Sequence, residues 1–159
     1  MANLEKKSVK RKKLESEDNV IKLPFSTKNQ EKTEILLDNS ILRQLYDIDP
    51  SGELLTSLCS ILNEQTSGFE KNFETFLSSN KYELLMKESH KLKSSFGSLG
   101  LISLQEICKC VELECKKNES DIDKSILKNQ LTLFKKIYSP SMDLLGISLN
   151  GFKYEKKAS

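Results

Sequence analysis

The chain contains a single histidine, His90, within the stretch "SHKLKSSFGSLG" at residues 89–100. Three lysines lie close to it in sequence, namely Lys87, Lys91 and Lys93. Cationic neighbours disfavour protonation, so the imidazole is expected to remain mostly neutral near pH 7, with a ring nitrogen free to attack. The same lysines would attract an anion and stabilise it on that nitrogen. This combination suits a phosphoryl acceptor, because phosphoryl transfer depends mainly on positioning and charge stabilisation.

The position of His90 around its helix predicts that the imidazole faces solvent. A helix turns about 100° per residue, which places an apolar set on the side away from His90. That set consists of Leu85, Leu92, Phe96 and Leu99. Polar or small residues and Met86 fall within about 60° of His90. The angle opposes a core histidine, and an idle surface histidine is the other alternative. No metal site is expected, because one histidine and Cys108-x-Cys110 on a different helix lack a usual zinc spacing.

Helical periodicity begins at Ile35 and predicts an all-α protein. The expected helices are a short one at about 35–46, a single long one ending near residue 76, one ending at Leu99, one ending near residue 115, and one at about 122–138. Gly100 is expected to be a left-handed cap, and Pro140 is expected to end the last helix. Four long amphipathic helices joined by short turns predict an antiparallel four-helix bundle with a short additional N-terminal helix, flanked by flexible tails.

The composition divides the chain into three regions. Residues 1–34 form a basic segment that is predicted to be a disordered tail. Residues 35–139 form the helical bundle, and residues 140–159 form an extension that is partly packed and then disordered. Six basic residues cluster near the start: Lys6, Lys7, Lys10, Arg11, Lys12 and Lys13. "NVIKLPF" at 19–25 is a candidate docking segment, although Pro24 argues against a long helix there.

Composition also narrows the class of protein. The net charge of +2 is too small to make nucleic acid the expected main partner. The first residues lack the apolar run of a secretory signal, and no stretch approaches the ~20 apolar residues of a membrane span. A cytoplasmic protein with reduced thiols is therefore expected. Cys108 and Cys115 lie on the apolar stripe of their helix and are interpreted as core residues.

The stretch "HKLKSSFGSLG" resembles the phosphoacceptor motif of histidine-containing phosphotransfer (HPt) domains, roughly H-x-L-K-[GS]-S-x-x-x-[LIV]-G. The residues in register are His90, Leu92, Lys93, Ser94, Ser95, Leu99 and Gly100. The resemblance extends over the helix pattern from about Ile41 to Tyr138. It implies a bundle whose histidine accepts a phosphoryl group from the aspartyl-phosphate of a response-regulator receiver domain and passes it to another receiver.

The resemblance also implies roles for particular residues. His90 would accept the group on Nε2, and Lys93 would help to hold the phosphoryl oxygens. Lys91 and Lys87 would add to the local field. Ser94, at a position that is often glycine in the family, could donate a hydrogen bond to the phosphoryl group.

A surface around His90 formed by Met86, Tyr82 and Gly97 would dock the receiver, with lysines at its rim. The expected partners are receiver domains and a hybrid or separate sensor histidine kinase. Mg²⁺ is expected on the receiver, and no cofactor is expected on this chain. The protein would be a monomeric carrier without kinase activity of its own.

Two alternatives stay open at this level. The bundle could be an interaction module that binds a receiver without phosphorylation of His90. The basic N-terminal tail could bind an anionic polymer, which would make binding steeply dependent on salt.

Overall fold

The computed structural model describes residues 35–157, all of them in helices or short connections. The basic cluster, the segment 19–25 and the predicted disordered N-terminal tail at 1–34 lie outside this range. The C-terminal extension lies within it except for residues 158–159, and the predicted disorder at its end is wrong up to residue 157, because a helix continues to Lys157. No strand occurs between residues 35 and 157, and no helix there is long and apolar enough to cross a membrane. The helices are α1 (Asn39–Ile48), α2 (Glu53–Thr66), α3 (Phe69–Ser78), α4 (Tyr82–Ser98), α5 (Ile102–Cys115), the 3-10 turn η1 (Glu119–Asp121) and α6 (Lys124–Lys157).

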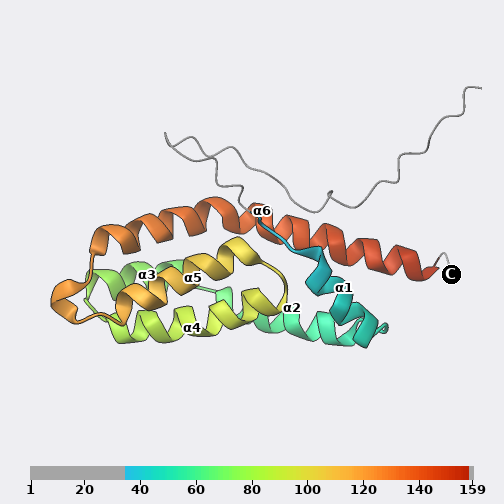
Figure 1. Ribbon diagram of the computed structural model, residues 1–159, viewed down its shortest axis with the longest axis horizontal. Helices are drawn as coiled ribbons and strands as arrows, with labels where there is room; N and C mark the ends of the chain where they lie inside the picture. The colour runs from blue at the N-terminus through green and yellow to red at the C-terminus, as the bar shows by residue number, and fades with distance from the viewer. Residues whose placement is uncertain (1–34, 158–159) are drawn as a thin grey trace, which may run out of the picture.

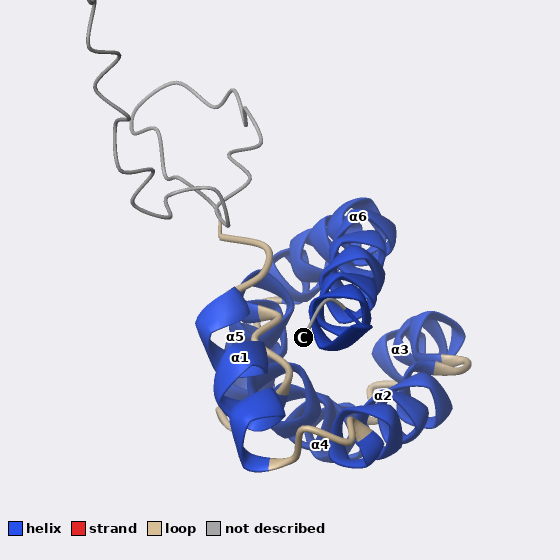
Figure 2. Ribbon diagram, turned by 90° about the vertical axis from the view of Figure 1, so that its right-hand side faces the viewer, coloured by secondary structure: helices blue, strands red, loops and turns tan. Residues whose placement is uncertain are grey.

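The helices form the predicted antiparallel bundle. The chain runs along α2 and α3, returns along α4, runs back along α5 and returns along α6 (Figures 1 and 2). The short helix α1 packs on α2 at one end of this bundle, as the sequence predicts. The fully buried core includes Phe73, Leu85, Leu92, Phe96, Leu104, Leu127 and Phe134. Cys108 and Cys115 belong to the same core, which confirms their interpretation as structural residues.

The predicted single helix ending near residue 76 is wrong, because the chain breaks between α2 and α3 at Gly68. This glycine has φ of +79°, a left-handed conformation that residues with a Cβ rarely adopt. The apolar stripe nevertheless continues across the break, since Leu62 before it and Phe69 after it are both buried. Periodicity alone could not detect an interruption that preserves the buried face.

The predicted end of the last helix at Pro140 is also wrong, because α6 continues through Pro140 to Lys157. A proline inside a helix costs about 3 kcal/mol through its missing N–H and its ring. The residues beyond it offset this cost by packing: Leu145 and Phe152 are buried, and the Phe152 ring stacks on Tyr46 at 5.2 Å between centroids. The second half of α6 therefore extends past the four-helix region and lies against α1 (Figure 1).

Gly100 closes the turn between α4 and α5, and it has the predicted left-handed conformation with φ of +72°. Its carbonyl accepts a hydrogen bond from the N–H of Asp38 at 2.8 Å. A Cβ at this position would lie 2.4 Å from the Asp38 carbonyl oxygen, so the site also needs glycine for close approach. This contact fastens the segment before α1, whose Leu36 and Leu37 are buried, to the end of α4.

Candidate functional site

His90 lies near the middle of α4, and 59% of its side chain is exposed. The residues predicted to lie on the other side of the helix, Leu85, Leu92 and Phe96, are all buried. The prediction that the imidazole faces solvent is therefore confirmed. The core packing of α4 fixes the rotation of the helix, and this rotation presents His90 at the surface.

The face of α4 next to His90 packs closely on α5. Ser89, Lys93 and Gly97 are spaced four residues apart and so lie along one face of the helix. Ser89 is fully buried, and a Cβ at Gly97 would lie 2.3 Å from Nε2 of Gln105 on α5. Small residues thus let α5 approach. This approach brings a carboxylate of α5, that of Glu112, to the side of His90.

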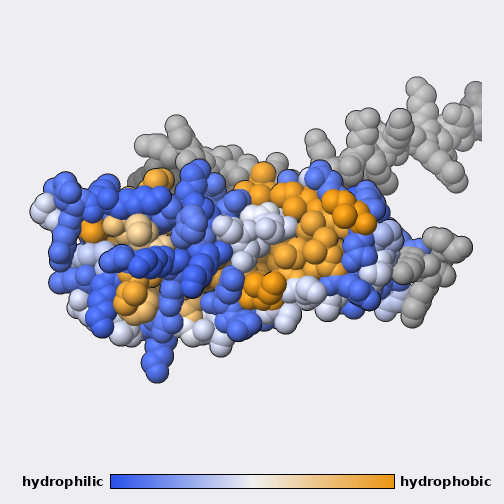
Figure 3. Space-filling view, turned by 90° about the horizontal axis from the view of Figure 1, so that it is seen from below, coloured by the Kyte–Doolittle hydropathy of each residue, from blue (hydrophilic) through white to orange (hydrophobic). Residues whose placement is uncertain are grey.

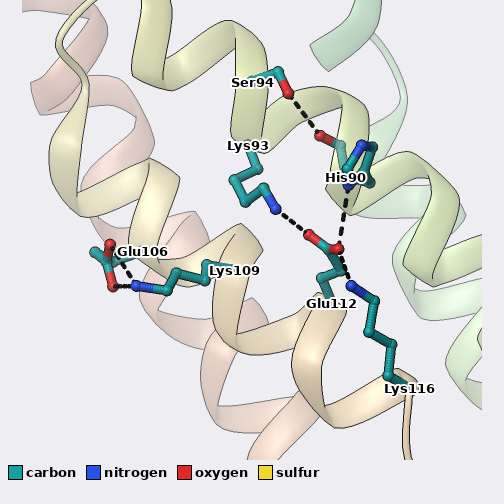
Figure 4. Close-up of polar contacts among 7 residues, drawn as sticks. All are labelled: His90, Lys93, Ser94, Glu106, Lys109, Glu112 and Lys116. Atoms are coloured by element: carbon teal, nitrogen blue, oxygen red, sulfur yellow. Dashed lines mark hydrogen bonds and ion pairs between the residues drawn. The ribbon is translucent and has the colours of Figure 1, made fainter.

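Glu112 is the centre of a polar network between α4 and α5 (Figure 4). Only 4% of its side chain is exposed, yet its two oxygens are within 2.5 Å of Nζ of Lys93 and Nζ of Lys116. The same oxygen that meets Lys116 lies 3.2 Å from Nδ1 of His90. Hydrogen bonds from Lys116 and Lys93, together with the one from His90, lower the pKa of Glu112 to about 2. The carboxylate is therefore ionised at neutral pH.

An ionised carboxylate beside Nδ1 selects the tautomer of a neutral imidazole. Glu112 can only accept, so Nδ1 carries the proton and donates it towards the carboxylate. The lone pair is then on Nε2, at the part of the ring directed away from Glu112. The geometry thus provides an outward nucleophilic nitrogen, with a negative charge behind the ring that would stabilise positive charge developing on it.

The surroundings of His90 differ from the predicted field of free lysines. Lys93 is paired with Glu112, and Lys87 donates to Glu83 at 2.6 Å. Lys91 is exposed. The prediction missed the buried carboxylate because Glu112 is 22 residues further along the chain. What remains is a pocket of about 420 Å³. It is lined by the imidazole, three lysines, one carboxylate and one apolar side chain: His90, Lys87, Lys91, Lys116, Glu112 and Met86.

A family model for the Hpt domain matches residues 52–137, from the residue before α2 to the first half of α6. The chain belongs to the Hpt-domain family. The match contains His90 and Glu112 and leaves out α1 and the second half of α6. No curated protein and no solved structure matches the chain. Hpt domains act in histidine phosphotransfer within phosphorelays, where they interact with receiver domains and kinases and generally have no catalytic activity of their own.

The other predicted residues of this Hpt domain differ in their access to His90. The hydroxyl of Ser94 is exposed and donates to the backbone carbonyl of His90 at 3.4 Å. Met86 is half-buried and lines the pocket, while Gly97 is half-buried beneath Gln105. Tyr82 is only 8% exposed and packs in the core as the first residue of α4. The expectation that Tyr82 offers a docking surface is therefore not met.

Glu112 and Lys116 are the polar residues at the site that sequence reasoning missed. A signal for Glu112 exists: it follows Cys108 by four residues, which places it about 40° from that core residue around α5. Lys116 follows Glu112 by four residues, the spacing of a helical ion pair. A carboxylate at the edge of an apolar stripe thus indicates a buried, paired acidic residue.

Burial alone does not distinguish Glu112, because Glu114 on the same helix is also buried. Glu114 accepts from Nζ of Lys117 and from the N–H of Asp123 at 2.8 Å, and so fixes the turn between α5 and α6. These bonds lower its pKa as well, with the Lys117 bond as the largest cause. The contact with the imidazole is what sets Glu112 apart from this structural carboxylate.

An apolar surface lies at one end of the Hpt domain, away from the polar site. Figure 3 shows it over α1 and the first half of α2, whereas the other end of the same face is mainly hydrophilic. Three large side chains of these helices are exposed, with Ile48 at 75%, Leu54 at 36% and Ile61 at 45%. We call these three residues the α1–α2 apolar patch.

Proposed function

We propose that this Hpt domain is a phosphorelay intermediate, in which His90 accepts a phosphoryl group from the aspartyl-phosphate of a receiver domain and passes it to another response regulator. One observation carries the proposal. The single histidine of the chain is exposed in the middle of α4, and a buried, ionised carboxylate lies 3.2 Å from its Nδ1. This arrangement favours Nε2 as the nucleophile.

The proposed step exchanges one bond for another. The lone pair on Nε2 of His90 attacks phosphorus, and the bond between phosphorus and the aspartyl oxygen breaks, so the receiver recovers its carboxylate. Positive charge develops on the imidazole, which keeps its proton on Nδ1. Glu112 stabilises that charge through the hydrogen bond from Nδ1. Transfer to the next receiver is the same step in reverse, with a new aspartate as the nucleophile.

Lysines would stabilise the phosphoryl oxygens. Lys87, Lys91 and Lys116 line the pocket beside His90, and Lys93 lies on the α5 side of the imidazole. The two ammonium groups on Glu112 exceed its single negative charge, which leaves a surplus of positive charge for an incoming anion. Mg²⁺ would be supplied by the receiver, because this chain acts as a carrier without kinase activity.

The docking surface that we propose has two parts. The basic pocket at His90 would face the acidic active site of the receiver, and the α1–α2 apolar patch would add apolar contact area. Met86 joins the basic part, since it lines the pocket. This assignment replaces the predicted contribution of Tyr82 with residues that are exposed. We also propose a monomer acting in the cytoplasm, with a hybrid or separate sensor kinase as the source of phosphate.

The proposal is tested by mixing the chain with a receiver domain that has been charged by acetyl phosphate. The wild-type chain is expected to gain an acid-labile, base-stable label, as phosphohistidine does. His90→Gln is the matched control, since it removes the only histidine and leaves an amide of similar size. Label on His90→Gln would contradict the proposal. Binding of the receiver without any transfer of label would support the interaction module instead.

A further inference from the structure

A groove runs between α2 and the second half of α6, on the flank of α2 away from the α1–α2 apolar patch. Its volume is about 680 Å³. Apolar residues from both helices line it: Leu55 and Cys59 on α2, and Leu149 and Phe152 on α6. Exposed polar residues, among them Asn63 and Lys153, also line it. We call this feature the α2–α6 groove.

Side-chain contacts lie near both ends of the groove, one between α2 and α6 and the other between α1 and α6. Beyond one end, the hydroxyl of Tyr138 on α6 donates to Oγ1 of Thr66 on α2 at 2.9 Å. At the other end, the ring of Tyr46 stacks on Phe152. Between these contacts α2 and α6 are not closely packed, and the groove lies there. The groove is therefore a bounded slot for a short apolar segment.

We propose that residues 19–25 of this same chain, "NVIKLPF", dock in the α2–α6 groove. Within residues 1–34 this stretch is the one concentration of apolar residues. Proline restricts φ to about −65° and opposes a helix, so we expect the segment around Pro24 to be extended. In an extended segment Ile21, Leu23 and Phe25 point to one side, and Lys22 points to the other. Three apolar side chains facing the groove, with a lysine facing solvent, fit an apolar slot that has a polar edge.

Residues 26–34 link the segment 19–25 to the described chain, and this short link favours docking in the groove. The described chain begins at Ile35, whose carbonyl accepts bonds from the N–H and the hydroxyl of Ser103. This point is therefore held beside the first turn of α5. Residues 26–34 can span at most about 30 Å, enough to pass around one helix of about 10 Å diameter. Linkage through such a tether gives an effective concentration in the millimolar range, so a weak apolar contact is sufficient.

The charges next to the segment 19–25 and at the groove are complementary. The residues just before the segment, "ESED" at 15–18, carry three carboxylates. Lys153 is exposed at the groove and could meet them. The proposal concerns the end of the molecule away from His90, and it does not rest on phosphotransfer.

Cys59 provides the test, because it lines the groove and is half-buried. The full-length chain is treated with iodoacetamide, and mass spectrometry measures the rate at which Cys59 is alkylated. The rate at Cys110 on α5 serves as the internal reference. Leu23→Asp/Phe25→Asp places two charges at the docking side chains and is expected to accelerate alkylation of Cys59 about tenfold, as release of a contact worth about 1.4 kcal/mol would. Lys22→Ser is the matched control and is expected to leave the Cys59 rate as slow as in the wild type.

The outcomes separate the possible occupants. Equal rates at Cys59 in the wild type and Leu23→Asp/Phe25→Asp, whether fast or slow, overturn the proposal. A wild-type rate that rises on dilution assigns the groove to a second copy of the chain and also overturns it. Thermal unfolding followed by circular dichroism confirms that the bundle is intact in each variant. A rise at Cys110 equal to that at Cys59 would indicate general loosening, which contradicts a local contact.

Discussion

The two ends of the bundle are held together by different interactions. At the His90 end, α4 and α5 meet through a polar network in which Glu112 binds Lys93, Lys116 and the imidazole. At the other end, α1, α2 and the second half of α6 present aromatic and aliphatic side chains, such as the Tyr46–Phe152 stack and the exposed Ile48. The two ends differ in chemistry: one end orients a ring nitrogen, and the other presents exposed apolar side chains.

The residues matched by the family model include the polar end but only part of the apolar end. Residues 52–137 include all of the polar network at His90. They exclude α1 and the second half of α6, which form much of the apolar end. The shared part of the Hpt domain thus contains the groups proposed for phosphoryl transfer. The helices outside the match contribute to the apolar surfaces together with α2, which lies inside it.

The largest effect is expected from breaking the polar end at Glu112. Glu112→Leu removes the acceptor for Nδ1 and leaves Lys93 and Lys116 without their shared carboxylate. Transfer from a charged receiver should slow by about 10–100-fold, because the tautomer and the orientation of the ring are no longer fixed. Glu112→Gln keeps an oxygen that can accept from Nδ1 and should lose less. Single-turnover labelling rates measure both, and equal rates for Glu112→Leu and the wild type would refute this role.

The second prediction concerns Gly100, where a substitution should weaken the attachment of the segment before α1 and leave the polar network unchanged. Gly100→Ala forces a Cβ against the Asp38 carbonyl in a left-handed conformation and should lower the free energy of unfolding by about 1–3 kcal/mol. Gly68→Ala is the matched control: its φ is also left-handed, but nothing lies within 4 Å of the added Cβ. Its cost should stay near 1 kcal/mol. Urea unfolding measures the two values, and a larger loss at Gly68 would contradict the role assigned to close approach.

A third prediction tests whether the α1–α2 apolar patch binds the receiver. Ile61→Glu places a charge in the patch and should weaken receiver binding about tenfold, without changing the fold, since Ile61 is 45% exposed. Ile147→Glu is the control, because Ile147 is 67% exposed on the second half of α6, outside the patch. Isothermal titration calorimetry compares the two variants with the wild type. Equal affinities would confine docking to the basic pocket.

The last prediction concerns the dependence of stability on pH. The folded-state pKa of Glu112 is about 2, below its ordinary value of 4.5. The stability that this carboxylate contributes is therefore complete above about pH 5 and is lost as pH falls towards 2. The difference in free energy of unfolding between the wild type and Glu112→Gln should shrink over that range. A difference that stays constant from pH 6 to pH 2 would show that Glu112 is not held ionised by its neighbours.

Much of the fold could be predicted from local sequence patterns. The period of the apolar residues predicted the bundle, and the angle between His90 and the buried face of α4 predicted its exposure. Gly100 predicts a left-handed cap because glycine adopts that conformation without a steric cost. The two errors in helix bounds share one cause. Gly68 and Pro140 act on the backbone, but packing of the neighbouring apolar residues decides whether the helix stops or continues there.

By itself the sequence determined which residue could carry a phosphoryl group, since there is one histidine and the core fixes its direction. Tertiary structure decided what stands behind that histidine and where the apolar surfaces lie. Glu112 reaches Nδ1 of His90 because the small residues Ser89 and Gly97 allow α5 to approach α4. The second half of α6 lies against α1 because the Phe152 ring is buried and stacks on Tyr46. Such contacts join residues far apart in the chain, and their energy depends on burial and distance, which periodicity within one helix does not contain.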